Sequence, residues 1–146
     1  MAKKYDPQMH TTEHILNQTM VRKFNCGRSF RAHIEKKKSK CDYHFNRNLT
    51  PDETGEIEEK VNSVIRKNFN VTEEFIMLEA AKKKYDLSKL PPGAGPKIRI
   101  VKVGHYDACP CIGQHVKNTG EIGKFKIQTT KYENGILRII FKLEPR

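Results

Sequence analysis

The sequence lacks any run of about 18 apolar residues, so no segment is expected to span a membrane as a helix. Its beginning, MAKKYDPQMH, is basic but contains no apolar stretch of the kind that a secretory signal needs. Only four cysteines occur, and none forms a CxxC redox pair, because Cys109 and Cys111 are separated by a single proline. We therefore expect a cytoplasmic protein with free thiols and no membrane partner.

Size and charge narrow the possibilities further. The 146 residues suffice for one compact domain with its own core, and we expect residues 1–146 to form a single domain. The 28 lysines and arginines outnumber the 17 acidic residues, which gives a formal net charge of +11. Such a charge attracts polyanions, and alone it allows RNA, DNA or an anionic membrane surface. A solvated surface of lysines would also account for it.

The first helix is predicted to carry a histidine pair. Asp6 followed by Pro7 is a good helix start, and an apolar stripe then recurs at helical spacing through Phe24. His10 and His14 lie one turn apart on the neighbouring stripe, so their side chains project together at the margin of the buried face.

The rest of the chain predicts an α+β fold, in which an antiparallel sheet packs against helices. Short strands are expected at 26–34 and 41–49 around a basic loop at 35–40. A capping box at Thr50 and Glu53 starts an amphipathic helix that continues through Ile65. Residues 69–77 are expected to form a strand, with a helix as the alternative, and 78–86 a short helix. A loop at 90–96, a buried strand at 97–103 and a second loop at 105–116 should follow. The chain should end in a hairpin, in which Asn134-Gly135 turns strand 124–132 into strand 136–143.

Two distant residue pairs suggest a metal site. His10 and His14 offer two imidazoles from a helix, while Cys111 and His115 offer a thiolate and an imidazole from a loop. Three nitrogens and one sulfur form a donor set that suits Zn²⁺. Either pair alone could arise by chance, but both together in a chain of this size favour a zinc site formed by His10, His14, Cys111 and His115.

The segments around these pairs resemble a known family. HTTEHIL and CIGQHVKNTGEIGKFKI are similar to the two signature blocks of the editing domain of alanyl-tRNA synthetase. The same blocks occur in its freestanding relatives, often called AlaX proteins, and in the second additional domain of threonyl-tRNA synthetase. The segments KIRIVKVGHYD, LTPDETGEIEEKVNSVI and GILRIIF extend the resemblance over nearly the whole chain.

The resemblance implies an editing-domain-like fold of the short freestanding form, and hydrolysis of the ester that joins a wrong amino acid to the tRNA 3′ end. The implied partner is the acceptor end of aminoacyl-tRNA rather than DNA, and the usual substrate is serine on alanine tRNA. The family's metal-binding and catalytic positions fall on His10, His14, Cys111 and His115. Zn²⁺ would activate a water, polarise the ester carbonyl or hold the substrate's amino group, and His10 or His14 could instead act as acid and base.

Departures from the family pattern concern the substrate pocket. The family commonly has Cys-Gly-Gly-Thr-His where this chain has Cys111-Ile112-Gly113-Gln114-His115, so Ile112 and Gln114 should reshape the pocket. Thr11 and Gln114, next to ligands, are candidates for contacting the substrate, as is Thr12. Asp107 is a further candidate at the site, where it would orient a ligand imidazole or cap the loop. Cys109 is taken as structural.

Basic clusters are the candidates for RNA contact, with phosphates as their expected targets. A solvated charged face is the alternative for each cluster. Two other functions remain open: a zinc-stabilised RNA-binding module without hydrolytic activity, and a small metal-dependent hydrolase of a substrate other than RNA, which the net charge disfavours. The candidate RNA-binding residues are Lys36, Lys37, Lys38, Lys40, Lys82, Lys83 and Lys84.

Overall fold

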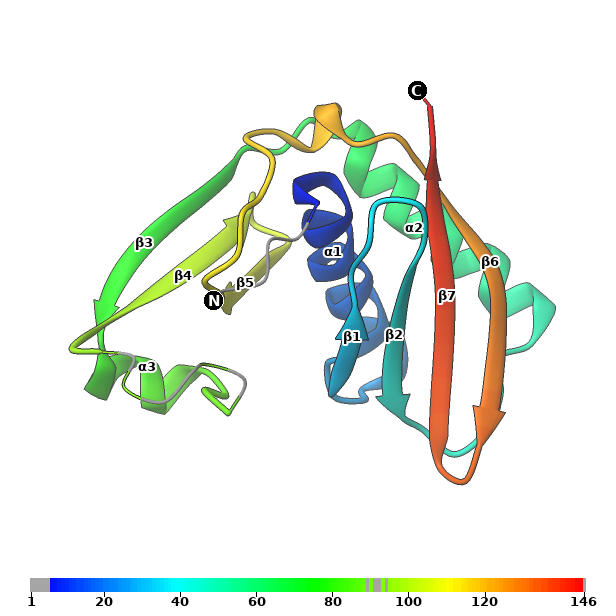
Figure 1. Cartoon of the computed structure of the whole chain (residues 1–146), viewed down its shortest axis with the longest axis horizontal. Helices are drawn as coiled ribbons and strands as arrows, with labels where there is room; N and C mark the ends of the chain where they lie inside the picture. The colour runs from blue at the N-terminus through cyan, green and yellow to red at the C-terminus, as the bar shows by residue number, and fades with distance from the viewer. Residues whose placement is uncertain (1–5, 89, 91–92, 94, 146) are drawn as a thin grey trace.

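Two antiparallel sheets flank a central helix (Figure 1). A computed structural model of the chain describes residues 6–88, 90, 93 and 95–145. Its four-stranded sheet has the order β1-β2-β7-β6, and its three-stranded sheet has the order β3-β4-β5. The strands are β1 (Arg31–His33), β2 (Ser39–His44), β3 (Val71–Met77), β4 (Lys97–Val103), β5 (Asp107–Pro110), β6 (Lys124–Glu133) and β7 (Ile136–Glu144).

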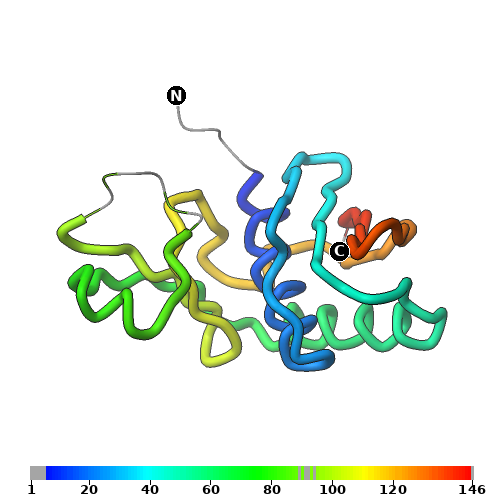
Figure 2. Tube along the Cα trace, turned by 90° about the horizontal axis from the view of Figure 1, so that it is seen from below, coloured from blue at the N-terminus to red at the C-terminus, as the bar shows by residue number. Residues whose placement is uncertain are grey.

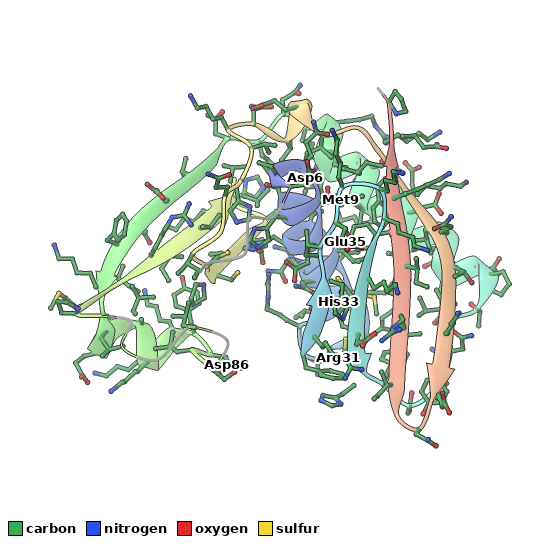
Figure 3. All side chains as sticks on the ribbon, in the orientation of Figure 1. Asp6, Met9, Arg31, His33, Glu35 and Asp86 are labelled. Carbon is green, nitrogen blue, oxygen red and sulfur yellow. The ribbon has the colours of Figure 1, made fainter. Side chains whose placement is uncertain are left out.

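The central helix α1 (Pro7–Phe24) begins and ends where its sequence indicates. The Asp6 side chain accepts a hydrogen bond from the Met9 amide at 3.0 Å, and Figure 3 labels both residues at the start of the helix. At the other end, Asn25 adopts the left-handed conformation that terminates helices. The helix is nearly surrounded, because it lies between the two sheets in both views (Figure 2). Polar residues that are exposed in most helices are therefore buried in this one.

The second long helix, α2 (Pro51–Arg66), joins the main core. Its capping box is complete, since Thr50 accepts from the Glu53 amide while the Glu53 carboxylate accepts from the Thr50 amide. Its apolar face packs with α1 and the four-stranded sheet, and Asn62 exchanges two hydrogen bonds with the backbone of Phe125 on β6. The buried apolar residues of the helix are Ile57, Val61, Val64 and Ile65.

A smaller core stabilises the three-stranded sheet. The short helix α3 (Leu78–Lys84) covers one face of this sheet, where Ala81 packs against Ile98 and Ile100. The opposite face contacts α1 near β5 and the end of β4. A single turn of 3-10 helix, η1 (Thr119–Glu121), then leads back to the four-stranded sheet.

The predicted α+β class and most of the elements are confirmed. The hairpin turns through Asn134 and Gly135, which have φ angles of 48° and 81°, as a two-residue turn with a right-handed twist requires. The predicted loop at 90–96 lies partly outside the described residues. Among the residues that the structure describes, no helix has the length and apolar character needed to cross a membrane.

Three expectations were wrong. The strand expected at 26–34 contains only Arg31–His33, because the preceding residues are held by other contacts: the Arg28 side chain donates to Asp107 on β5 and the Ser29 amide donates to Asn17 on α1. The next strand is Ser39–His44 rather than 41–49, so Lys40 belongs to β2 and not to the basic loop. The loop expected at 105–116 contains strand β5, which pairs with β4 and thereby completes a second sheet where one sheet was expected.

Candidate metal centre

The two predicted residue pairs meet between α1 and the segment that follows β5. His10 and His14 are buried on α1, and one donor atom from each of His10, His14, Cys111 and His115 lies within 4.8 Å of the others. The Cys111 Sγ is 3.4 Å from His10 Nε2 and 3.5 Å from His115 Nε2. Residues a hundred positions apart thus surround one point.

These distances suit a tetrahedral ion. Zinc lies about 2.0–2.1 Å from a nitrogen ligand and about 2.3 Å from a sulfur ligand. At a tetrahedral angle, these bond lengths separate the nitrogen atom from the sulfur atom by about 3.6 Å. The two measured sulfur–nitrogen distances are 3.4 and 3.5 Å. The arrangement therefore fits a metal ion with three imidazoles and one thiolate, a donor set of the kind that zinc prefers.

Backbone and hydroxyl groups orient two of the imidazoles. The Nδ1 of His10 lies 3.2 Å from the main-chain oxygen of Gln114, to which a protonated Nδ1 donates. The Nδ1 of His115 lies 2.9 Å from Thr11 Oγ1, which also accepts from the Val116 amide. With Nδ1 protonated, the Nε2 of each ring carries the lone pair that a metal needs. Thr11, a candidate for substrate contact, thus contacts the potential metal ligand His115.

A buried ion-pair network of Asp107 and Arg28 lies against the ring of His14. Asp107, another candidate residue, lies 3.6 Å from His14 Nδ1 and accepts two hydrogen bonds from Arg28 and one from Gln18. Burial raises the pKa of Asp107, but its hydrogen bond to His14 and the charge of Arg28 outweigh burial and lower it to about 2. Asp107 is therefore a carboxylate placed to orient an imidazole.

Cys109 is closer to the site than the sequence indicated. Its Sγ lies 3.3 Å from His14 Nδ1, and His14, Asp107 and Cys109 form a second group of potential donors. The Arg28 guanidinium also reaches this group, at 3.5 Å from the Cys109 sulfur. Because a fixed cation already neutralises this second group, the set of His10, His14, Cys111 and His115 is the better metal site.

Electrostatics favour a thiolate at Cys111. Burial raises the pKa of Cys111, but the contacts of its sulfur with His10, His115 and His14 outweigh burial and lower it to about 3. Burial and the neighbouring histidines lower the pKa of His115 to about 4. Burial also lowers the pKa of His14, yet Cys109 and Asp107 raise it well above its ordinary value. Cys111 as a thiolate and His115 as a neutral imidazole are in the forms that bind metals, whereas His14 would have to release a proton on metal binding.

Two residues that the sequence analysis did not assign hold the Cys111–His115 segment. Arg99 on β4 donates to the main-chain oxygens of Cys111 and Gly113, at 3.0 and 2.8 Å. Gly113 lies against the ring of His10, and a Cβ at this position would be 2.1 Å from His10 Cε1. The recurring glycine of the family pattern could have indicated Gly113, whereas an arginine within an apolar strand gave no comparable indication.

A carboxylate that the sequence analysis also omitted lies beside the donors. Glu13 on α1 is buried, and its Oε1 is 3.6 Å from His10 Nε2. Its other carboxylate oxygen is 3.4 Å from the Asn17 side chain, which donates to it. Glu13 therefore offers a proton acceptor at the edge of the site.

The remaining candidate residues lie at the surface or contact the backbone. Gln114 is exposed, while Thr12 donates to the Gln8 main-chain oxygen at 2.7 Å. The two basic clusters are not adjacent, because the loop between β1 and β2 lies near α1 in the middle of the molecule whereas helix α3 lies at one end (Figure 1). Six of the seven lysines are exposed and Lys40 is half-buried.

Comparison with known proteins identifies the family. Residues 98–140 match the family described as the threonyl and alanyl tRNA synthetase second additional domain. The sequence is 33% identical over 135 residues, or 89% of this chain, to the alanine–tRNA ligase of Aeropyrum pernix. It is 34% identical over 128 residues, or 87%, to that of Fervidobacterium nodosum, and 32% identical over 119 residues, or 81%, to that of Coxiella burnetii. The chain is an alanyl-tRNA synthetase-related editing-domain protein.

This relationship covers one part of the synthetases. The chain spans 15% of the Aeropyrum and Fervidobacterium ligases and 14% of the Coxiella ligase. The activity of the whole ligases is therefore not transferred to it. The matched residues 98–140 include nearly all of β4, the whole of β5 and the Cys111–His115 segment. The family match therefore covers two of the four potential metal ligands, Cys111 and His115.

Proposed function

We propose that this editing-domain protein hydrolyses the ester bond of mischarged aminoacyl-tRNA, with Ser-tRNA(Ala) as its first candidate substrate and Zn²⁺ as its metal. The observation that carries the proposal is the convergence of His10, His14, Cys111 and His115 in a chain related to alanyl-tRNA synthetase. The aminoacyl ester is already activated, so hydrolysis needs a positioned water and stabilisation of the developing oxyanion.

The protein's own groups would divide this work. A bound Zn²⁺ would supply Lewis-acid chemistry at the ester. His10 and His115 hold their Nε2 atoms toward Cys111, because Gln114 and Thr11 engage their other nitrogens. Glu13 would accept the proton of the attacking water, since its carboxylate lies beside His10 Nε2.

Substrate selection would fall to Gln114 among the candidates named from sequence. Thr11 and Thr12 already hold His115 and the Gln8 backbone, and Asp107 holds Arg28 and Gln18. Gln114 has an exposed side chain next to a ligand, with an amide able to donate to or accept from a substrate hydroxyl. A site that hydrogen-bonds such a hydroxyl discriminates against an amino acid that lacks it.

A second function is favoured by the number of donors. Four protein ligands are typical of closed structural zinc sites, whereas catalytic sites usually keep one position open. The four donors of this chain therefore also support a zinc-stabilised RNA-binding module that does not hydrolyse its ligand.

Deacylation assays separate the two functions. Purified protein is incubated with Ser-tRNA(Ala), Gly-tRNA(Ala), Ser-tRNA(Thr) and Ala-tRNA(Ala), and the loss of each ester is followed over time. Selective loss of a mischarged species, abolished by Glu13→Gln and by metal removal, supports the hydrolase and identifies its substrate. Binding of all four tRNAs without loss of any ester supports the binding module and refutes the hydrolase.

A further inference from the structure

Two large apolar side chains are exposed on one strand at the edge of the three-stranded sheet. Phe75 is 57% exposed and Met77 is 55% exposed on β3. They are two residues apart, so they project from the same face of the sheet. Helix α3 covers the opposite face, where it packs on Ile98 and Ile100. Edge strands are commonly protected by charged side chains, and neighbouring exposed apolar residues can mark a binding surface.

The strand register connects this face to the candidate metal centre. Phe75 pairs with Arg99 on β4, and the Arg99 main-chain oxygen accepts a hydrogen bond from the Cys111 amide at 3.2 Å. Phe75, Arg99 and Cys111 therefore form one row across the sheet, with side chains on the same face. Two interstrand spacings of ~4.8 Å put Phe75 about 10 Å from the metal donor along that row.

Positive charges lie beside the apolar residues. Met77 pairs with Lys97, which is exposed and forms no ion pair with any residue in the described part of the chain. Arg99 donates to Glu73, so its charge is partly neutralised. Helix α3 starts directly after Met77 and ends in Lys82, Lys83 and Lys84, and Figure 1 places it at this end of the sheet. An aromatic ring near several cations is the arrangement that binds single-stranded nucleic acid.

We propose that the β3–β4 face, which consists of Phe75, Met77, Lys97 and Arg99, binds the single-stranded 3′ nucleotides of tRNA, with Phe75 stacking on a base. The inference rests on the proposed function, because it takes the ester at the metal centre as the starting point of the bound strand. From there the strand would pass over Arg99 and Phe75 toward α3, whose lysines would meet its phosphates. Stacking is independent of sequence, since every base has an aromatic face.

Binding of uncharged RNA tests this proposal without requiring hydrolysis. The probe is a short, 5′-fluorescein-labelled single-stranded RNA that ends in CCA, followed by fluorescence anisotropy. Phe75→Ala should weaken binding about tenfold, because one stacked base is lost, while Phe75→Tyr should bind as the unmodified protein does. Thr72→Ala is the matched control, because Thr72 is exposed on the opposite face of β3 and should leave affinity unchanged. In the deacylation assay, Phe75→Ala should raise KM and leave kcat unchanged.

Other results would overturn the proposal. Equal affinity of the Phe75→Ala and unmodified proteins for the RNA would remove the stacking role while leaving the hydrolase intact. No measurable RNA binding by the unmodified protein would also refute it. Sedimentation equilibrium provides the third test: a dimer that Phe75→Ala converts to a monomer would make this face a contact between two copies. A different result would separate the two proposals. If the unmodified protein deacylates no tRNA but Phe75→Ala weakens its binding to RNA, RNA binding by the β3–β4 face is supported and the proposed hydrolase activity is refuted.

Discussion

Gly113 shows how closely the backbone approaches a metal-ligand side chain. The Cβ of an alanine there would lie 2.1 Å from His10 Cε1, so either the ring or the Cys111–His115 segment must move. Gly113→Ala should therefore lower zinc affinity about 10- to 100-fold, as happens when the surroundings of a ligand are disturbed. Titration against a fluorescent zinc chelator measures the change. Gly27→Ala is the control, because a Cβ at Gly27 meets nothing within 4 Å. Equal zinc affinity in both variants would contradict the proposed geometry.

Cys109 and Cys111 should contribute differently to zinc binding. Cys111 contacts the donor nitrogens of both His10 and His115, whereas Cys109 contacts His14 and lies beside Arg28. We expect about one zinc per chain in the unmodified protein and in Cys109→Ala, and far less in Cys111→Ala. Metal analysis of the purified proteins gives the answer. Zinc retained by Cys111→Ala and lost from Cys109→Ala would reassign the thiolate ligand to Cys109.

At the scale of elements, one carboxylate joins three strands of the large sheet. Asp42 on β2 lies opposite Arg31 on β1 and Arg138 on β7, and accepts hydrogen bonds from both. The Arg138 hydrogen bond, together with Arg31, lowers the pKa of Asp42 from 3.8 despite its burial. A lowered pKa means that Asp42 stabilises the fold above its unfolded-state pKa, and that this contribution is lost as pH falls through the folded-state value.

Asp42→Asn should therefore lower the free energy of unfolding at neutral pH by about 1–3 kcal/mol, because it removes charged acceptors from a buried site. The difference from the unmodified protein should start to shrink below about pH 4, where the unfolded-state carboxylate takes up a proton, and should disappear only below the lower pKa of the folded state. Urea unfolding at a series of pH values measures both effects. Glu59→Gln is the control, since its ion pair with Arg66 is exposed and should contribute little. A difference that does not vary with pH would argue against the ionised carboxylate as the cause.

Sequence patterns predicted the elements whose stability is local. The capping box of α2, the Asp6-Pro7 start of α1 and the Asn134-Gly135 turn depend on neighbouring residues, and each lies where it was expected. Strand β5 was missed because four residues that include a proline and a cysteine lack apolar alternation, and pairing with β4 decides their conformation. Arg99 was missed for a similar reason, since its role depends on which loop crosses the sheet.

For the whole molecule, the meeting of the two ligand pairs could be predicted only through the family resemblance. Spacing placed each pair on its own element, but contacts between α1 and β5 join residues far apart in the chain, and periodicity carries no information about such contacts. Residue types and spacing suggested the four donors, and the family pattern pointed to the same set. That pattern did not indicate Glu13, which lies one helical turn from His10 on α1, or Cys109, whose position beside His14 follows from the packing of α1 against the small sheet.

Metal removal should affect the two sheets differently. An ion bound by α1 and the segment after β5 would connect the small sheet to the rest of the molecule. A ligand present at about 100 times its Kd adds about 2.7 kcal/mol to the free energy of unfolding. Removal of the zinc by a chelator should therefore lower Tm by roughly 5–10 °C. Hydrogen exchange should become faster in β4 and β5 and stay constant in the β6–β7 hairpin. Restoring zinc is the control and should reverse both changes, whereas an unchanged Tm after chelation would show that the donors hold no stabilising ion.

The separation of the two ligand pairs also fixes when the centre can form during translation. His10 and Cys111 are 101 residues apart, so a ribosome has made α1 long before it adds the cysteine. During that interval the polar side of α1 has neither the second sheet nor the thiolate to cover it. Capture of the metal by all four ligands thus has to wait until Cys111 and His115 have been made. A chain truncated before Cys111 would keep His10 and His14, yet it would lack both Cys111 and His115, which complete the donor set.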